Sequence, residues 1–504
     1  MAVAVSIDPR TPCLIGVAAR TWRPDAVGAD GAPEPLAMWE EVVRAAVADA
    51  GRPGVLGATD SLQVVYCQTV QYDDAVGRLA ERLGIEPRHR HYSGIGGTTT
   101  QQLVGTTAER MLAGDLDLAV ITSAEALATQ RAWKKRGERF PYAFRPAERR
   151  PYPWESPPDA AEIAHEVFQA WLTFAVFENA RRARRGEGLD EYRAGIGRLL
   201  APMTAVAAAN PHAWYPVARS AEEIVAATPG NRMVAYPYTK YSIAVMDVDM
   251  AAAIVLATHE RAEALGVPPE RRVYLRGSAY ATDPVLVAAH PEMSRSPAMV
   301  RASSAALAGA GVGIDDVAHL DLYSCFASSL HFATDALGIA PDDPRGLTVT
   351  GGLPYHGSPA SGYITHSIAA MAAILRSDPG SLGLVSGVGM HMTKHVFGVW
   401  STEPGELRVP ESGPAPEATP VTATAEGDAT VAAYAVVHGR EGGPEWALVV
   451  CDLPDGARAY GRLEDRAACA AAEHEELVGR PIRLETVDRD GPAGPARVNL
   501  VTVK

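Results

Sequence analysis

The chain has 504 residues, of which 47% are hydrophobic and 21% are charged, a composition typical of a globular protein and unlike that of a disordered or fibrous one. This length exceeds one ordinary hydrophobic core and predicts two or three packed units. The formal net charge of −14 opposes attraction to nucleic acid and to anionic lipid, so neither is an expected partner.

The cysteines and the start of the chain indicate a cytoplasmic protein. The five cysteines are spread along the chain without a C-x-x-C pair, which predicts neither a zinc site nor a redox pair. Residues 1–21 lack the basic and the long apolar segments of a signal peptide. No run reaches the ~18 apolar residues that a membrane span needs. We therefore expect a reducing, cytoplasmic location, no membrane span and no metal.

Residues 1–129 alternate short β-rich runs with alanine-rich helical stretches. Strands are expected at Ser61–Tyr66 and Leu116–Thr122, and helices at Trp39–Ala50 and Thr100–Ala113. This alternation predicts an α/β fold with a mostly parallel sheet covered by helices.

Residues 130–241 interrupt this pattern with arginine and tryptophan clusters and with prolines. One long helix is expected there, at Asp159–Arg185, and we interpret the whole region as an insertion that lies over the functional site. We assign residues 242–290, together with residues 1–129, to the first half of the fold.

A second round of strands and helices occupies residues 291–401. Helices are expected at Pro297–Gly309 and Phe326–Leu337, and strands at His319–Tyr323 and Gly383–Ser386. The repeated order predicts two related halves.

The last hundred residues predict a linker and a further domain. Residues 402–425 are rich in proline, glutamate and glycine and have no apolar period, as a linker does. In residues 426–504, short strands are expected at Thr430–His438, Glu445–Asp452, Ala457–Leu463 and Pro481–Val487. Such spacing predicts a small all-β barrel, for which an OB-fold is one candidate.

Five segments carry a known pattern in a known order, namely SGIGGTTTQQLVGTTAERMLAGDLDLAVITSAEAL, DVDMAAAIVLAT, DLYSCFASSL, GGLPYHGSPASG and LVSGVGMHM. They resemble, in turn, the nucleophile loop with its helix and strand, the segment before the closing strand, the HDCF motif, the GGxxxxGHPxGxSG turn and the terminal C-x-G loop of the thiolase superfamily. The HDCF form is that of sterol-carrier-protein thiolases. The whole chain resembles thiolase-like proteins (type 1) with an additional C-terminal β domain. This resemblance implies a thiolase fold of two βαβαβαββ halves with mixed, mostly parallel sheets.

The resemblance also implies that the usual catalytic residues have been replaced. Gly97 stands where a thiolase has its acyl-accepting cysteine, Ser358 where it has the histidine base, and Ser386 where it has the second cysteine. A neutral hydroxyl cannot replace a thiolate at pH 7, because its pKa lies far above the ~8.5 of cysteine. Thiolysis through an acyl-cysteine is therefore not expected.

Other candidate groups remain at the implied site. Tyr323 takes the place of the histidine or asparagine that helps to form an oxyanion hole, Cys325 keeps the cysteine of HDCF, and Tyr363 and His356 flank the glycine-rich turn. Two tyrosines here also resemble thiolase-fold aldolases that cleave steroid side-chain CoA esters. A phenol can donate a hydrogen bond to a thioester carbonyl or move a proton.

Each candidate also has an ordinary structural interpretation. The tyrosines and the cysteine can be packed side chains, and the histidine can order a turn. The serines can hydrogen-bond a substrate or simply remain from the replacement. Gly97, Gly357 and Gly387 are assigned to backbone turns or to an oxyanion hole, and glycine alone does not distinguish the two.

One basic and aromatic concentration, at residues 131–150, is a candidate site for the phosphates and adenine of coenzyme A. Arginine matches phosphate bidentately and stacks on rings, and we assign this role to Arg136, Arg145 and Arg149. The alternative is an ordinary solvated insertion.

We therefore expect an acyl-CoA-handling enzyme, similar to acetyl-CoA acetyltransferase but lacking the nucleophilic cysteine. Two alternatives stay open, namely a retro-aldol lyase acting on a β-hydroxyacyl-CoA and a non-catalytic acyl-CoA or lipid-binding protein. No tightly bound cofactor is expected, coenzyme A thioester is the expected substrate, and a homodimer is an open possibility.

Overall fold

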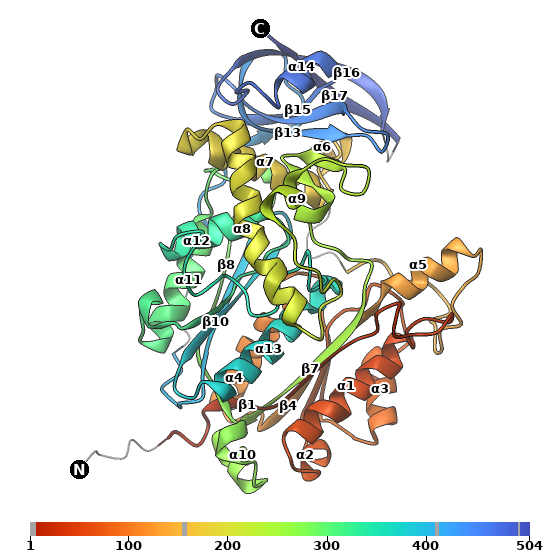
Figure 1. Cartoon of the computed structure of the whole chain (residues 1–504), viewed down its shortest axis with the longest axis vertical. Helices are drawn as coiled ribbons and strands as arrows, with labels where there is room; N and C mark the ends of the chain where they lie inside the picture. The colour runs from red at the N-terminus through yellow and green to blue at the C-terminus, as the bar shows by residue number, and fades with distance from the viewer. Residues whose placement is uncertain (1–6, 154–158, 409–412, 492–493) are drawn as a thin grey trace.

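A computed structural model describes residues 7–153, 159–408, 413–491 and 494–504. Four residues of the expected linker, 409–412, and two of the expected β domain, 492–493, lie outside the described residues. Figure 1 shows a large α/β body below and a smaller β-rich domain at the top, with helices of residues 130–241 between them.

The large body is built on one mixed sheet of nine strands in the order β3-β2-β4-β7-β1-β8-β11-β10-β9. Its strands are β1 (Pro12–Thr21), β2 (Ser61–Val64), β3 (His89–Tyr92), β4 (Leu118–Ala126), β7 (Asp249–Thr258), β8 (Val273–Thr282), β9 (His319–Asp321), β10 (Leu382–Gly389) and β11 (Lys394–Ser401). Pairing is parallel in β2-β3, β2-β4 and β9-β10 and antiparallel in the middle of the sheet.

The two ends of this sheet repeat one another in reverse. The order β2-β4-β7-β1 of the first half matches β9-β10-β11-β8 of the second, and β1 meets β8 only at Cys13↔Tyr274 and Leu14↔Val273. The predicted pair of related halves is therefore present. In the strand order, β7 belongs to the first half and β8 to the second. The first half therefore ends before residue 290, the boundary expected from the sequence.

Helices form three layers around the two halves. The helices are α1 (Pro35–Asp49), α2 (Gly54–Gly57), α3 (Ala75–Leu83), α4 (Thr99–Leu112), α10 (His259–Ala264), α11 (Pro297–Ala310), α12 (Ala327–Leu337) and α13 (Tyr363–Ser377). Helix α1 packs on the first half and α11 on the second, whereas α4 and α13 contact strands of both halves and lie between them. Helix α1 begins with Pro35 and buries Leu36, Trp39, Val43 and Val47, which is the helical spacing of one apolar face.

The prediction of one continuous helix at Asp159–Arg185 is wrong. The chain forms α6 (Ala160–Ala164) and α7 (Ala170–Arg185), with Glu166 between them at a φ of 60°. The break has a tertiary cause, because His165 accepts from the backbone N–H of Asn499 at 3.0 Å and Glu166 pairs with Arg462 at 2.8 Å. Both partners belong to the C-terminal domain.

The rest of residues 130–241 forms α5 (Leu127–Lys135), α8 (Leu189–Ala209) and α9 (Ala221–Val225), followed by strands β5 (Met233–Tyr236) and β6 (Tyr238–Thr239). Short 3-10 turns lie at Lys240–Ser242, Pro269–Arg271, Val287–Ala289, Ile314–Asp316 and Ala360–Gly362.

The C-terminal domain is the second sheet, in the order β12-β15-β17-β16-β13-β5-β6, with β14 paired to β13 and β15. Its own elements are β12 (Val421–Thr422), β13 (Gly427–His438), β14 (Pro444–Asp452), β15 (Arg458–Leu463), α14 (Arg466–Ala471), β16 (Pro481–Gly491) and β17 (Gly494–Val503). The prediction of a barrel-like, β-rich C-terminal domain is confirmed, although no strand was predicted where β17 forms. The insertion supplies β5 and β6, since Val436 pairs with Tyr236 across the two segments.

Within the described part of the chain, no helix has both the length and the apolar composition needed to cross a membrane.

Candidate active site

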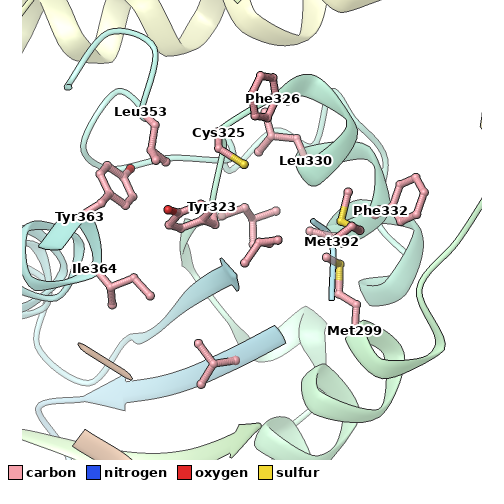
Figure 2. Packing of buried hydrophobic residues seen from close by; sticks show 14 of the residues in the cluster. Met299, Tyr323, Cys325, Phe326, Leu330, Phe332, Leu353, Tyr363, Ile364 and Met392 are labelled. Carbon is pink, nitrogen blue, oxygen red and sulfur yellow. The ribbon is translucent and has the colours of Figure 1, made fainter. Parts of the chain in front are cut away.

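Two loops of the second half bring the predicted tyrosines together, and a loop of the first half places Gly97 beside them. Tyr323 follows β9, Tyr363 begins α13, and Gly97 lies just before α4. The two phenol rings meet edge to face with their centroids 5.5 Å apart, and both side chains are buried. Figure 2 shows the hydroxyl end of Tyr323 directed toward the Tyr363 ring. We call Gly97, Tyr323 and Tyr363 the tyrosine site.

The space beside Gly97 is filled. A Cβ atom placed on this glycine would lie 2.1 Å from the carbonyl oxygen of Val388 and 2.5 Å from the hydroxyl oxygen of Tyr323. Real Cβ contacts do not occur below about 3 Å, and one of these atoms belongs to the backbone. A nucleophilic side chain therefore has no room here, and the hydroxyl of Tyr323 stands in its space.

Tyr363 is held by a buried carboxylate that sequence reasoning did not single out. Its hydroxyl is 2.6 Å from Oγ1 of Thr350 and donates to Oδ2 of Asp321 at 3.3 Å. Asp321 is fully buried and also accepts hydrogen bonds from Thr348 at 2.7 Å and from Ser367. The signal was available in the sequence, because Asp321 ends a short strand and is the first residue of the quoted segment DLYSCFASSL.

Burial raises the pKa of both phenols. For Tyr323 the main cause is desolvation, followed by the nearby Cys325. For Tyr363 it is desolvation and then the charge of Asp321, which together hold the pKa well above 10. Both tyrosines are therefore neutral hydrogen-bond donors at neutral pH.

The two predicted serines are placed where they hold the backbone. Oγ of Ser386 accepts from the backbone N–H of Tyr323 at 2.8 Å, which fixes the loop after β9. The backbone N–H of Ser358 donates to the carbonyl of Val245 at 2.9 Å, and its side chain is buried. In the described structure Ser386 thus orients Tyr323.

Cys325 points away from the tyrosine pair. Its thiol donates to Oγ of Ser329 at 3.7 Å, and Figure 2 shows the sulfur on the side of Leu330, away from Tyr363. Burial raises the pKa of this thiol to about 12, so it is not a thiolate at neutral pH.

Two histidines lie beside the tyrosine site. The ring of His356 is 6.0 Å from that of Tyr363 and 5.4 Å from that of His366, measured between centroids. Burial lowers the pKa of His356 to about 3 and that of His366 well below 6.5, so both imidazoles are neutral. Nδ1 of His391 is hydrogen-bonded to Oγ1 of Thr173 at 2.8 Å.

Close backbone approach explains the glycines of the site. Gly351, Gly352 and Gly357 have φ values of 106°, 76° and 109°, which side-chain-bearing residues rarely adopt. Gly387 has no room for a side chain, because an added Cβ would lie 2.4 Å from Cδ1 of Ile364 and 2.9 Å from the Gly97 carbonyl oxygen.

The three arginines are exposed on the insertion rather than at the tyrosine site. Arg136 stacks over Trp133 at 4.6 Å and pairs with Glu138 at 3.2 Å. Arg145 lines a cavity of about 450 Å³ together with Lys134. Arg149 is exposed and does not line this cavity. The described residues contain no group of three or more His, Cys, Asp or Glu side chains that could hold a metal ion.

Comparisons with known proteins agree with this architecture. The family model described as "Thiolase-like protein type 1 additional C-terminal domain" matches residues 408–491. The crystal structure of a monomeric SCP2-thiolase-like protein type 1 (STLP1) from Mycobacterium smegmatis is 30% identical with a TM-score of 0.84, over 99% of this chain and 100% of that chain. No match was found among curated proteins.

Two more distant structures share the fold of the large body. An acetyl-CoA acetyltransferase from Syntrophomonas wolfei has 15% identity and a TM-score of 0.57, and the Ltp2-ChsH2(DUF35) aldolase has 19% identity and a TM-score of 0.58. Each match covers 79% of this chain and 100% of the other. The thiolase fold, the additional β domain and the identity to STLP1 over the whole length together show that the chain belongs to the SCP2-thiolase-like proteins of type 1.

Proposed function

We propose that the chain binds an acyl-CoA thioester at the tyrosine site and acts on it as an acyltransferase-like enzyme without an acyl-cysteine intermediate. The contact at Gly97 carries this proposal. The hydroxyl of Tyr323 stands 2.5 Å from the position that the Cβ of a nucleophile would need. Coenzyme A thioester is the substrate, and no tightly bound cofactor is needed.

The chemistry that Tyr323 offers is stabilisation of negative charge on oxygen, whereas the hydroxyl proton of Tyr363 is donated to Asp321. Tyr323 and Tyr363 stay protonated at neutral pH, because burial raises both pKa values. A neutral phenol donates to a thioester carbonyl, and its hydrogen bond strengthens as that oxygen gains charge. Enolate formation or attack at the carbonyl would be favoured by such a donor.

A retro-aldol lyase is the second candidate, favoured by the contact between two tyrosines 5.5 Å apart. In a β-hydroxyacyl-CoA the bond between the α and β carbons would break. The hydroxyl proton would pass to a base, the hydroxyl oxygen would become a carbonyl, and the electron pair would form an enolate that is then protonated. Tyr323 would donate to the enolate oxygen.

A non-catalytic acyl-CoA-binding protein is the third candidate, favoured by the pKa values of two candidate proton-transfer groups, Cys325 and His356. Burial places the pKa of Cys325 at about 12 and that of His356 at about 3. General acid-base catalysis works best with a pKa near the working pH, and neither value meets this condition.

The phosphates of coenzyme A would bind at the cavity on the insertion. Lys134, Arg139 and Arg145 line it, and Glu138 is the only carboxylate among its lining residues. This excess of positive charge suits a phosphate or pyrophosphate group. We therefore expect Arg145→Ala to weaken binding of CoA more than binding of an acyl-pantetheine that lacks the nucleotide.

Calorimetric titration with acetyl-CoA tests the proposal. We expect binding to the full chain and a loss of about five- to tenfold in Tyr323→Phe, because one hydrogen bond to the carbonyl is removed. Tyr355→Phe is the matched control, because Tyr355 is also buried. In the described structure it makes no ring contact or hydrogen bond with Gly97, Tyr323 or Tyr363. If acetyl-CoA does not bind, the proposal is wrong.

Turnover separates the candidates. Acyl transfer from 3-ketoacyl-CoA to free CoA supports the acyltransferase, and release of a carbonyl compound from a β-hydroxyacyl-CoA supports the lyase. Binding without either product supports the third candidate. The homodimer stays a prediction, to be checked by sedimentation, and the similar STLP1 is described as monomeric.

A further inference from the structure

A second cavity, of about 670 Å³, opens beside the first half of the sheet. It runs between β1 and α13, reaches α1 on one side, and ends at two histidines of the glycine-rich turn and α13. We call it the histidine pocket. Its residues are Val17, Ala18, Ala19, Ala45, Asp49, Asn210, His212, Arg271, His356, His366, Ala369, Ala370, Ala373, Arg376 and Ser377.

The inner end of the pocket carries buried polar atoms without partners. Both ring nitrogens of His366 and Nε2 of His356 are buried, and none has a hydrogen-bond partner among the described residues. Both side chains are at most 2% exposed. Buried polar groups are almost always hydrogen-bonded, so these three nitrogens call for a partner that enters the pocket.

The ring nitrogens at this end limit what that partner can be. The amide nitrogen of Asn210 donates to the carbonyl of Thr350 at 2.9 Å and lies 3.3 Å from Nδ1 of His356. A neutral imidazole has one donor and one acceptor nitrogen, whichever of the two carries the proton. The two unpartnered nitrogens of His366 therefore offer one donor and one acceptor, and Nε2 of His356 adds a further hydrogen-bonding group. Together they match a hydroxyl or a carbonyl oxygen.

The walls between this end and the solvent are apolar and small. Ala18, Ala369 and Ala370 present methyl groups, and the small side chains leave the volume open. At the mouth, Arg271 and Arg376 both pair with Asp49, at 2.9 and 2.7 Å. The two guanidiniums share one carboxylate, so the mouth, which His212 also lines, keeps an excess of positive charge. The inner end differs, because the imidazoles of His356 and His366 are neutral there.

We propose that the histidine pocket binds an uncharged apolar molecule whose hydroxyl or keto oxygen bonds His356 and His366. This inference goes beyond the proposed function, because the pocket is separate from the space beside Gly97 and does not require coenzyme A. It also adjoins the tyrosine site, because the ring of His356 lies 6.0 Å from that of Tyr363. Its volume lies within the range of small-molecule pockets, which is about 300–1,000 Å³.

Ligand-observed NMR on the full chain tests this inference with three probes: cyclohexanol, cyclohexanone and methylcyclohexane. The first two should bind about tenfold more tightly than the third, because only they carry an oxygen for the imidazoles. His366→Leu replaces the imidazole with an apolar side chain of similar size. It should bring the three affinities to within about twofold of one another.

Two variants that fill the pocket test its location. Ala370→Trp should abolish binding of cyclohexanol, and Ala373→Trp, at the exposed mouth, does the same with less demand on packing. Ala48→Trp is the matched control, because Ala48 is exposed on α1 and does not line the pocket. It should leave binding unchanged.

The inference is overturned if no probe binds to a folded protein, or if methylcyclohexane binds as tightly as cyclohexanol in the unmodified chain. It is also overturned if the Ala373→Trp variant binds cyclohexanol normally. Tyr323→Phe should leave the cyclohexanol affinity unchanged, so failure of the acetyl-CoA proposal and failure of this one give different results.

Discussion

At the scale of single residues, the space beside Gly97, where the family resemblance implies a nucleophile, is filled by other atoms. The Tyr323 hydroxyl and the Val388 carbonyl both crowd Gly97. A simple deletion would have left a cavity, which would destabilise the fold. Because this space is filled, we expect that a cysteine introduced at Gly97 would not restore thiolase activity.

Gly97→Cys should destabilise the protein by about 2 kcal/mol or more, since its Cβ meets a backbone oxygen that cannot move without shifting β10. It should not gain thiolysis activity. Urea unfolding and a thiolysis assay measure both effects. Gly96→Ala is the control, because its Cβ would have its nearest neighbour, Oγ1 of Thr99, at an ordinary 3.5 Å. A fully stable Gly97→Cys variant would contradict the crowding argument.

Asp321→Asn should cost about 2–4 kcal/mol of unfolding free energy. The carboxylate of Asp321 now accepts hydrogen bonds from the hydroxyls of Thr348 and Ser367. The NH₂ group of an asparagine would also be a donor and could not accept one of these bonds. Tyr363→Phe, which removes only one of these donors, should cost less. Chemical denaturation of the two variants checks the order, and equal losses would show that Asp321 does not organise the group.

At the scale of elements, α7 joins the large body to the C-terminal domain. It packs on β13, and the amide of Asn179 donates to the backbone carbonyls of Tyr236 and Tyr434, one on each side of the pairing between β5 and β13. Arg182 of the same helix forms a two-bond pair with Glu476 at 2.7 and 2.8 Å. The C-terminal domain is thus built into the fold through the insertion.

Arg182→Met should lower the free energy of unfolding by about 2 kcal/mol, because the guanidinium is only 3% exposed and its partner carboxylate loses both bonds. Arg185→Met is the control on the same helix. Arg185 is 50% exposed in its pair with Glu187, and such surface pairs contribute at most ~1 kcal/mol. Thermal unfolding of both variants decides, and equal effects would contradict a role for α7 as the joint.

At the scale of the whole molecule, buried neutral histidines make the fold sensitive to acid. Burial lowers the pKa of His356 to about 3 and those of His290 and His391 to about 4. In the unfolded chain each takes up a proton below about 6.5. Their contribution to stability is therefore complete above that pH and is lost as the pH falls toward the folded values.

Between pH 7.5 and 5.5 these three histidines should together lower the free energy of unfolding by about 4 kcal/mol, which is about 1.4 kcal/mol for each group over the whole range. His290→Phe keeps a ring beside Phe177, with which His290 is now in contact at 4.9 Å, and removes one proton site. The slope of its unfolding free energy against pH should be smaller, between pH 5 and 6, by about 1.4 kcal/mol per pH unit. Denaturant unfolding at several pH values measures this, and an unchanged slope would mean that His290 is already protonated in the fold.

The sequence predicted most of the scaffold because its signals are local. The helix predicted at Trp39–Ala50 forms as α1, and the strands predicted at Ser61–Tyr66 and Leu116–Thr122 form as β2 and β4. The split of the helix at Asp159–Arg185 was missed, because it depends on Asn499 and Arg462, which lie about three hundred residues away in the chain.

By itself the sequence determined an α/β body and a C-terminal β domain, because apolar periodicity is a local property of the chain. The resemblance of its ordered motifs to the thiolase superfamily implied the scaffold and placed Gly97 where the reactive cysteine would stand. Only the tertiary structure decided that Tyr323 fills the space at Gly97, that Asp321 holds Tyr363, and that β5 of the insertion completes the C-terminal sheet. These features depend on distances between segments far apart in sequence, and such distances are set by packing of the whole fold.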